Sequence, residues 1–516
     1  MKQPPRGELW LIALFVLSAA VSPLRRELFV GDETKYAQVI REMHSSGALL
    51  LPTLDGQPFT HKPPVHFWFI AALTSLFGPY SIWPYVIPSL AAFAFLLWVM
   101  SRASREILPE SNPALALFAC ATSLLVWGSA QTARMDVSFT ALIAVGGWML
   151  YRFFAGGDFR ALHLAALALS VATLIKGPMS IVIGFVLFVI EWWRRKRIPR
   201  GNYWWAALIL IAIPLLWFVP AVISGGDAYA REVLEKQLAR RAMGAWVHKS
   251  PPWYYLTHAP GTLFPWFLPL VAALLSLRER ALRIDGARFC ASWIAAVLIP
   301  YSLMSSKLDV YMMSMVPAVA MLAGWFASTA AGRWERWGVL LHQATLALVA
   351  LIGIAGLTVV SRLVKPEERA LVVLPEVRGL FIVMILASIA ALIFGRTLRR
   401  AFIATGMVPL AVLLYAASFM MPLLNAEAST QRLIGAIERQ NVAAADVELF
   451  ACPYLWGRNM PRALEQVRHV DEATLGGPAV IVTSRKHVSR IAPQLRSYRK
   501  VDEFRMIGKW FDVYRR

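Results

Sequence analysis

The chain has 516 residues, of which 58% are hydrophobic and only 16% are charged, and its mean hydropathy is +0.54. Soluble domains average about 45–50% apolar and about 25% charged residues, so the composition argues against a soluble globular enzyme, a disordered protein and a fibrous protein. The net charge of +21 must be tested against membrane topology before it is taken as a sign of nucleic-acid binding.

Apolar runs long enough to approach a membrane span recur along most of the chain. A span needs about 20 mostly apolar residues, and the sequence predicts about thirteen such helices. The first run has no convincing small-residue cleavage site after its apolar core, so we expect a retained helix rather than a signal peptide. The predicted spans lie near 8–24, 81–100, 113–131, 137–151, 161–175, 178–193, 203–223, 261–277, 289–304, 310–330, 337–360, 379–395 and 401–424.

Lysine and arginine concentrate in every second loop, which predicts the orientation. Short cytoplasmic loops carry an excess of these residues, and the cluster Arg194–Arg200 lies in that set. The N-terminus is then cytoplasmic and the C-terminus external, in a cell inner membrane. The basic cluster beside Trp192 and Trp193 is interpreted as a topology anchor and not as a nucleic-acid patch. The segments predicted on the external face are 25–80, 224–260, 362–378 and everything after 424.

The last 90 or so residues change character. Charges return, and the apolar runs shrink to strand length, at Val447–Ala451 and Ala479–Val482. Helical stretches are expected around Gln431–Gln440, Arg462–Arg468 and His487–Leu495. The sequence therefore predicts a multispan transmembrane domain over 1–424, with an external loop 25–80, and a small soluble α/β domain over 425–516.

The first external loop begins with a segment of helical spacing. Asp32, Tyr36 and Val39 recur at one face after Gly31, which predicts a helix lying at the membrane interface. Asp32 and Glu33 fall in its first turn, where acids are also favoured by the helix dipole alone. The segment by itself leaves a structural and a functional interpretation open.

Charged residues recur at other predicted external helix ends. His61 and Lys62 precede two prolines, and Lys62 could be a membrane anchor or a phosphate-binding cation. Cations gathered on one face could hold a lipid phosphate, and acids could accept a proton or bind a metal. The other charged ends are Arg134-Met135-Asp136, Lys176-Gly177-Pro178 and Ser306-Lys307-Leu308-x-x-Tyr311.

With these motifs in this order, the sequence resembles the bacterial aminoarabinose transferases that modify lipid A. More broadly, it resembles the protein O-mannosyltransferase-like glycosyltransferases of the GT-C fold. The resemblance implies an all-α polytopic membrane protein of about thirteen helices with a periplasmic C-terminal domain. It also implies a sugar donor linked to a polyprenyl phosphate, usually undecaprenyl phosphate, with no nucleotide cofactor. The motifs that carry it are Asp32-Glu33-x-x-Tyr36, Lys62-Pro63-Pro64, Arg134-Met135-Asp136, Lys176-Gly177-Pro178 and Ser306-Lys307-Leu308-x-x-Tyr311.

The resemblance assigns roles to these positions. Asp32 matches the proposed catalytic acid and Asp136 the second acid, with Glu33 as a further catalytic candidate. Lys62 and Tyr311 match residues that hold the lipid phosphate, and an arginine of the 224–260 loop should join them. The substrate-binding candidates are Tyr36, His61, Lys62, Lys176, Arg240, Arg241, Lys307 and Tyr311, with the choice between Arg240 and Arg241 left open.

Two positions depart from the family pattern. His61 stands where aminoarabinose transferases usually carry Glu, and Asp309 stands where a proline is expected. A histidine can bind a metal but cannot be an anionic partner for an amino sugar. A divalent metal bound by Asp32, His61 and Asp136 is therefore an open alternative.

The predicted activity is inverting transfer of a sugar, plausibly 4-amino-4-deoxy-L-arabinose, from undecaprenyl phosphate to lipid A, with Asp32 as base. The alternative within the enzyme class transfers mannose or another sugar to protein or glycan. The alternative of another class is a lipid or sugar transporter, which predicts charges near the bilayer midplane and broken helices in two matching halves. The sequence shows neither feature, and it leaves the sugar, acceptor and oligomeric state open.

Overall fold

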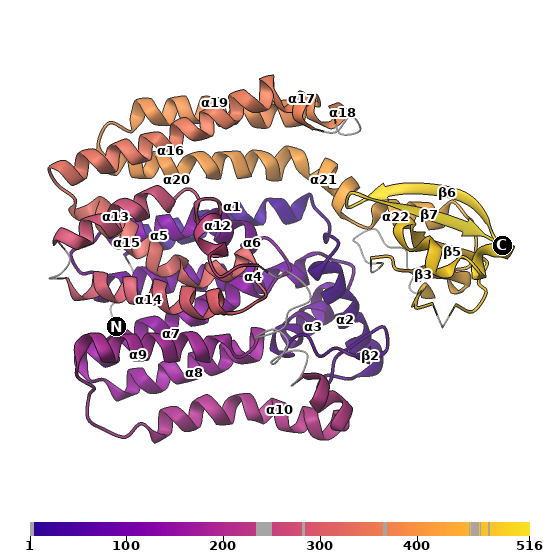
Figure 1. The fold of residues 1–516 in the computed structure, drawn as a ribbon, viewed down its shortest axis with the longest axis horizontal. Coiled ribbons are helices and arrows are strands. Elements are labelled where there is room, and N and C mark those ends of the chain that lie inside the picture. The colour runs from indigo at the N-terminus through magenta and orange to yellow at the C-terminus, as the bar shows by residue number, and fades with distance from the viewer. Residues whose placement is uncertain are drawn as a thin grey trace.

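The computed structural model describes residues 5–233, 250–280, 284–364, 369–453, 455, 464, 466–472 and 475–516. A bundle of long helices fills one side of the molecule, and a small sheet domain projects from one end of it (Figure 1). The chain termini lie at opposite ends of the long axis (Figure 1). The helices of the bundle are α1 (Arg6–Ala20), α4 (Trp83–Ile107), α5 (Pro113–Ala121), α6 (Leu124–Ala130), α7 (Asp136–Gly156), α8 (Phe159–Lys176), α9 (Met179–Arg195), α10 (Trp204–Glu232), α12 (Tyr254–Thr262), α13 (Phe267–Arg280), α14 (Asp285–Leu303), α15 (Val316–Thr329), α16 (Arg333–Thr358), α19 (Pro375–Phe394), α20 (Leu398–Tyr415) and α21 (Met421–Ala428).

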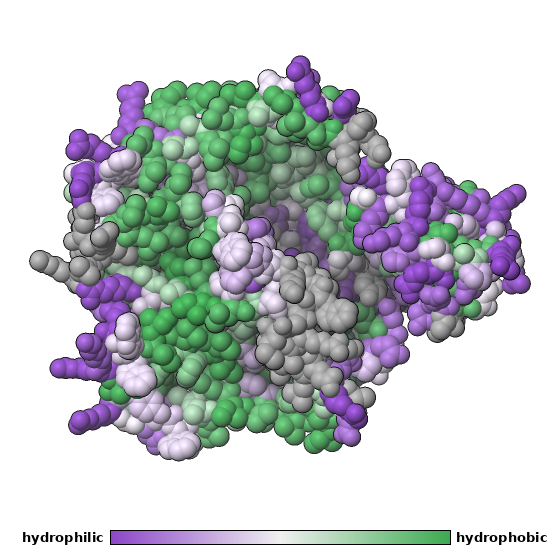
Figure 2. Space-filling model, in the orientation of Figure 1, coloured by the Kyte–Doolittle hydropathy of each residue, from purple (hydrophilic) through white to green (hydrophobic). Residues whose placement is uncertain are grey.

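Ten described helices are long and apolar enough to cross a membrane, so the chain is a multispan membrane protein. Two bent pairs could each supply one more span: α5 with α6, bent by 65°, and α12 with α13, bent by 114°. The predicted run 178–193 forms α9, which has 17 residues and ends in Arg194 and Arg195. The prediction of about thirteen spans therefore compares with ten to twelve spans in the described residues. Figure 2 shows the apolar belt of the bundle between two polar ends.

The first external loop contains the predicted helix, followed by a short hairpin and a second helix. Helix α2 (Asp32–Ser46) begins after Gly31, whose φ of 130° is a conformation that residues with a side chain rarely adopt. It ends at Gly47 in the left-handed conformation. Strands β1 (Thr53–Leu54) and β2 (Gln57–Pro58) form the hairpin, and α3 (Val65–Phe77) packs against α2. Asp32 and Glu33 are thereby placed in the first turn of α2.

The C-terminal domain contains a mixed five-stranded sheet of order β4-β3-β5-β7-β6. Strands β3 (Val447–Phe450) and β5 (Val480–Ser484) confirm the two predicted strands, and α22 (Gln431–Glu438) confirms the first helix. Arg468 lies in a strand and not in a helix, and the stretch around 487–495 forms 3₁₀ turns. The predicted boundary between 424 and 425 falls inside α21. The remaining strands are β4 (Arg468–Val470), β6 (Arg499–Met506) and β7 (Lys509–Arg515).

Hydrogen bonds hold α21 and this domain against the start of the first loop. The backbone N–H of Val30 donates to the carbonyl of Ala428 at 2.7 Å. The side chain of Gln431 donates to Glu27 at 2.7 Å. The sheet domain and the helix that begins at Asp32 therefore lie at the same end of the bundle (Figure 1).

Candidate functional site

Charged side chains from three separate segments meet at that end of the bundle. The carboxylate of Asp32 contacts Lys35 at 2.9 Å and the guanidinium of Arg134 at 3.4 Å. Arg134 also contacts Asp136 at 3.0 Å, and Lys176 donates to the other oxygen of Asp136 at 2.5 Å. The ion-pair chain Asp32–Arg134–Asp136–Lys176 thus joins three of the predicted site residues through Arg134.

The local folding of α7 and α8 explains the inner half of this chain. Asp136 begins α7 and Lys176 ends the antiparallel neighbour α8, so an acid lies at a helix N-terminus and a cation at a helix C-terminus. The ammonium group of Lys176 also lies 5.2 Å from the ring centre of Tyr311. Tyr311 stacks in turn on Tyr301, with ring centres 4.8 Å apart.

The two acids of the chain differ in their access to solvent. The side chain of Asp136 is 4% exposed and is engaged by two cations, whereas the side chain of Asp32 is 37% exposed. Burial alone would raise the pKa of Asp32, but Lys35, Arg134 and Lys62 together hold it below its ordinary value. Asp32 is therefore an accessible carboxylate anion at neutral pH.

Glu33 lies in a different environment from its neighbour Asp32. Its buried carboxylate pairs with Arg26 and accepts hydrogen bonds from the backbone N–H groups of Phe29 and Ala133, at 2.8 and 2.6 Å. Burial alone would raise the pKa of Glu33, but Arg26 and these backbone donors lower it. This geometry favours a structural role for Glu33 over the predicted catalytic one.

An apolar cavity of about 270 Å³ opens beside the ion-pair chain. One wall is α10, with Trp217 and Phe218, and another is the turn Gly177-Pro178 after α8. Lys62 and Lys176 both line it, with His61 next to Lys62. The arrangement suits a ligand with an apolar chain and an anionic group, because two ammonium groups meet apolar walls.

The other predicted binding residues lie around this centre. Tyr36 is buried on α2 and packs edge-to-face on Phe67, with ring centres 5.2 Å apart. Lys307 is buried and donates to the backbone carbonyls of Ser250 and Met304, which makes it a local anchor of its loop. Arg240 and Arg241 lie outside the described residues.

The predicted metal ligands Asp32, His61 and Asp136 do not form a metal-binding group. Among the described residues, no three His, Cys, Asp or Glu side chains are gathered so that they could hold an ion. Both aspartates are instead paired with lysine and arginine. A divalent metal stays an untested prediction, and no step proposed below passes through one.

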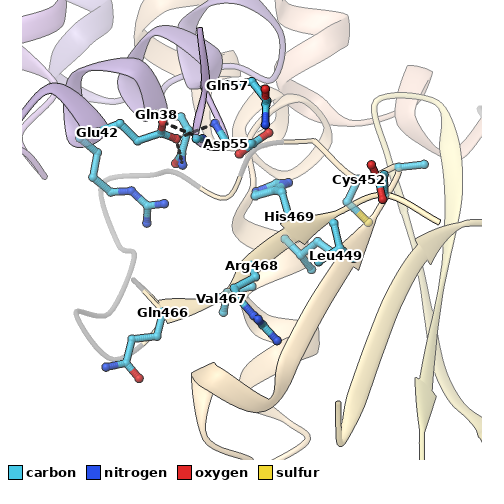
Figure 3. Close-up of a pocket in the computed structure, with 15 residues that line it drawn as sticks. Gln38, Glu42, Asp55, Gln57, Leu449, Cys452, Gln466, Val467, Arg468 and His469 are labelled. Carbon is cyan, nitrogen blue, oxygen red and sulfur yellow. Dashed lines mark hydrogen bonds between the residues drawn. The ribbon is translucent and has the colours of Figure 1, made fainter. Parts of the chain in front are cut away.

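A larger polar cavity, of about 760 Å³, lies between α2 and the C-terminal sheet (Figure 3). Arg41 and Asp55 line it from the first loop, and Arg468 and His469 line it from β4. Burial and the charge of Glu42 raise the pKa of Asp55 to about 6, with Arg41 opposing them. The sequence analysis missed this cavity because its two walls are more than 400 positions apart in the chain.

Sequence reasoning also assigned no role to Arg26 and Lys35. A usable pattern existed for Arg26, since it follows the first span on the face that was predicted to be external, where arginine is disfavoured. An arginine at such a place is expected to pair with an acid, as Arg26 does with Glu33. For Lys35, the i, i+3 spacing from Asp32 on a helix predicts the contact that the structure contains.

Comparison with known proteins places the chain beside membrane glycosyltransferases. Residues 61–221 match the family model of dolichyl-phosphate-mannose-protein mannosyltransferase. A relative from Pseudomonas fluorescens, named undecaprenyl phosphate-alpha-4-amino-4-deoxy-L-arabinose arabinosyl transferase 1, is 27% identical over 66% of this chain and 62% of its own. The relative of that kind from Edwardsiella ictaluri is 25% identical over 70% of this chain and 66% of its own. An uncharacterized protein of Aquifex aeolicus is 25% identical over 58% and 60%. The chain thus spans about three fifths of the length of the curated relatives it matches.

Solved structures show the same fold. The crystal structure of ArnT from Cupriavidus metallidurans bound to undecaprenyl phosphate superposes with a TM-score of 0.73, covering 98% of both chains at 20% identity. The arabinosyltransferase EmbB from Mycobacterium smegmatis reaches a TM-score of 0.50 at 15% identity, over 83% of this chain and 42% of EmbB. The fold is therefore GT-C, and the predicted resemblance to aminoarabinose transferase-like proteins is confirmed.

Proposed function

We propose that this chain, an aminoarabinose transferase-like protein with the GT-C fold, is a membrane glycosyltransferase that uses a sugar linked to a polyprenyl phosphate. The observation that carries the proposal is the apolar cavity in which Lys62 and Lys176 meet the membrane-facing helix α10, directly beside the ion-pair chain. An isoprenoid chain would lie on the apolar walls, and its phosphate would lie between the two ammonium groups.

The two cations also suit the chemistry of the leaving group. When the bond between the anomeric carbon and the phosphate oxygen breaks, the phosphate leaves with the electron pair and gains negative charge. Lys62 and Lys176 would stabilise that charge in a partly dry environment, where electrostatic contacts are stronger than in water. Asp136 holds Lys176 and Arg134 in place from the buried side.

Asp32 is the proposed base for an acceptor hydroxyl. The acceptor oxygen would attack the anomeric carbon from the face opposite the phosphate, with inversion, while its proton passes to the carboxylate of Asp32. Lys35 and Arg134 keep the pKa of Asp32 low in the free protein, which makes it a weak base. Because a bound donor phosphate would share these positive charges, donor binding would raise the pKa of Asp32 and strengthen the base. An acceptor phosphate would need positioning rather than deprotonation.

For the sugar and acceptor, we propose 4-amino-4-deoxy-L-arabinose and lipid A. The names of the relatives from Pseudomonas fluorescens and Edwardsiella ictaluri support that sugar. The second candidate is transfer of mannose or another sugar to protein or glycan, which the match to the mannosyltransferase family favours. His61 next to Lys62 favours the second candidate, because a neutral or cationic imidazole gives no anionic partner to an amino sugar.

The test compares bacteria that express the wild-type chain with bacteria that express Asp32→Asn. Mass spectrometry of lipid A and of periplasmic glycoproteins should show an added aminopentose on lipid A in the wild type alone. A sugar added to protein alone would select the second candidate. If neither pool changes, and the purified protein transfers no sugar from a polyprenyl-phosphate donor, the proposed activity is wrong.

The orientation is likewise a proposal, supported by the alternation of basic loops and by the placement of the termini at opposite ends of the bundle (Figure 1). We expect the protein to lie in the inner membrane with the N-terminus cytoplasmic and the sheet domain periplasmic. In a background without the three native cysteines, Glu472→Cys should react with a membrane-impermeant thiol reagent in intact spheroplasts, whereas Arg197→Cys should react only after lysis. Both residues are exposed in the structure. The opposite labelling pattern would place the ion-pair chain on the cytoplasmic face.

A further inference from the structure

We propose that the buried pair Arg26–Glu33 is a positioning device that sets the geometry between Asp32 and Arg134. The inference rests on the proposed function, because it concerns the residues assigned to proton transfer and charge stabilisation. In this proposal Glu33 never touches substrate. It acts on the reaction through the two segments that it ties together.

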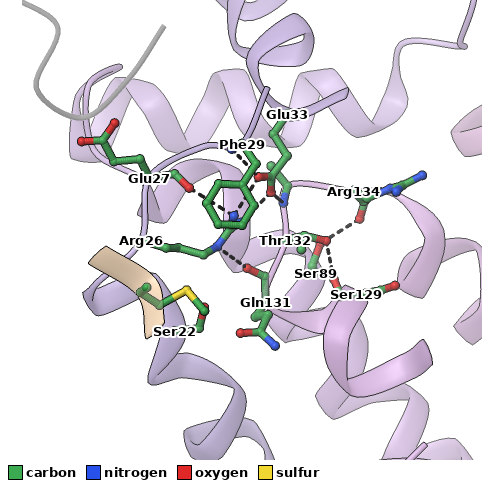
Figure 4. A network of polar contacts seen from close by, with 12 residues as sticks. Ser22, Arg26, Glu27, Phe29, Glu33, Ser89, Ser129, Gln131, Thr132 and Arg134 are labelled. Atoms are coloured by element: carbon green, nitrogen blue, oxygen red, sulfur yellow. Dashed lines mark hydrogen bonds and ion pairs between the residues drawn. The ribbon is translucent and has the colours of Figure 1, made fainter. Parts of the chain in front are cut away.

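The pair is a closed polar network (Figure 4). The guanidinium of Arg26 contacts both carboxylate oxygens of Glu33, at 2.5 and 2.8 Å, and the two side chains are 2% and 5% exposed. Arg26 also donates to the backbone carbonyls of Gln131 and Glu27, at 3.2 and 3.1 Å. A fork-to-fork contact of this kind fixes distance and angle together, which a single point charge does not.

The network joins the two chain segments that carry the exposed charges. Glu33 follows Asp32 directly, and its carboxylate accepts the backbone N–H of Ala133 at 2.6 Å. Ala133 directly precedes Arg134, and adjacent Cα atoms are about 3.8 Å apart. One buried carboxylate therefore holds the backbone of Asp32 and the backbone of Arg134 in a set relation.

The exposed contact needs such a support. The pair Asp32–Arg134 has a separation of 3.4 Å, and both side chains are about a third exposed. An ion pair of that exposure contributes little by itself. The hydroxyl of Ser89 adds a second support, since it donates to the carbonyl of Arg134 at 2.8 Å. The network sets the backbone of Arg134, and the buried Asp136, at 3.0 Å, holds its guanidinium.

Stability alone does not explain why a charged pair, rather than an apolar pair, occupies this site. A buried ion pair loses much solvation energy, and well-packed apolar residues in its place are often equally stabilising. An apolar pair would leave the N–H groups of Ala133 and Phe29 without their acceptor. The charged pair thus provides a specific geometry in the turn that precedes Arg134.

The test compares the transfer kinetics of Glu33→Gln with those of the wild type. This substitution keeps the shape of the side chain but removes its charge and replaces one carboxylate oxygen with an amide nitrogen. With transfer rates normalised to folded protein, we expect kcat to fall about 10-fold or more while the donor KM changes less than about 2-fold, because the donor cations Lys62 and Lys176 lie outside the network. Arg134 helps to lower the pKa of Asp32. Loosening Arg134 should therefore move the acidic limb of the rate profile to higher pH.

The matched control is Glu191→Gln, in a buried pair at the opposite end of the bundle. Glu191 is fully buried and contacts Arg194 and Arg195 at 2.6 and 2.8 Å, so its loss should lower the Tm without moving kcat or the acidic limb. If Glu33→Gln does not fold, Arg26→Lys takes its place, since it keeps the charge and loses the fork. An unchanged kcat and an unmoved limb in the folded variant would overturn the positioning role. Absence of transfer by the wild type would instead refute the proposed function.

Discussion

Replacing Asp32 with asparagine is expected to lower turnover by about 100-fold or more, the lower range of what a positioned base contributes. Asparagine keeps the size of the side chain and is as good as aspartate at a helix start, so α2 should still form. Gly31 is the N-cap and Asp32 is the first helical residue, so Asp32→Asn removes no side-chain cap. The measurement is transfer from a purified polyprenyl-phosphate sugar to lipid A in detergent.

Thermal unfolding separates chemistry from folding in this experiment. Asp32 is partly exposed and its contacts are with partly exposed cations, so the Tm of Asp32→Asn should stay close to the wild-type value. Asp446→Asn is a suitable control, since that acid lies in the C-terminal domain, away from the ion-pair chain. Wild-type turnover in folded Asp32→Asn would show that Asp32 is not the base, and Asp136 would become the better candidate.

Removing the ammonium group of Lys62 is expected to reduce kcat/KM by about 10- to 100-fold, which corresponds to the loss of one charge-assisted contact of about 1.5–3 kcal/mol. Lys62 lines the apolar cavity with Lys176, and Pro63 directly after it restricts its backbone conformation. Lys62→Ala should therefore raise the donor KM and lower kcat, because the phosphate is bound in the ground state and gains charge in the transition state.

One variant tests whether the charge or the contact geometry of Lys62 matters, and a second variant is its control. Lys62→Arg keeps the positive charge and should recover part of the lost activity, whereas Lys486→Ala removes an exposed lysine of the C-terminal domain and should have no effect. Wild-type kinetics in Lys62→Ala would place the lipid phosphate elsewhere, and the two-lysine cavity would then lose its proposed role.

Much of the fold could be predicted from local patterns. Membrane spans follow from apolar length, because a helix in lipid must satisfy its backbone internally and present apolar side chains. The interfacial helix α2 followed from the spacing of Asp32, Tyr36 and Val39, and strands β3 and β5 followed from short apolar runs. The hairpin of β6 and β7 was missed, because its residues carry many charges and contain no apolar run of strand length.

The candidate site could be predicted only as a set of motifs. The sequence alone predicted that Asp32, Lys62, Asp136 and Lys176 are polar residues near helix ends on one face of the membrane domain. It could not determine that Asp136 is buried between Lys176 and Arg134, which follows from the packing of α7 on α8. Pairing over 40 positions is a property of helix packing and leaves no local pattern.

Asp32 and Glu33 show most clearly what the sequence alone could not predict. Both acids stand in the first turn of one helix, and the sequence treats them alike. Successive residues on an α-helix point about 100° apart, so Glu33 points into the interior while Asp32 points toward the exposed ion-pair chain. The sequence determines that two carboxylates lie at this membrane boundary. The tertiary structure decides which one is accessible, because Arg26 and the backbone N–H of Ala133, 100 positions away, hold Glu33 in the interior and leave Asp32 outside.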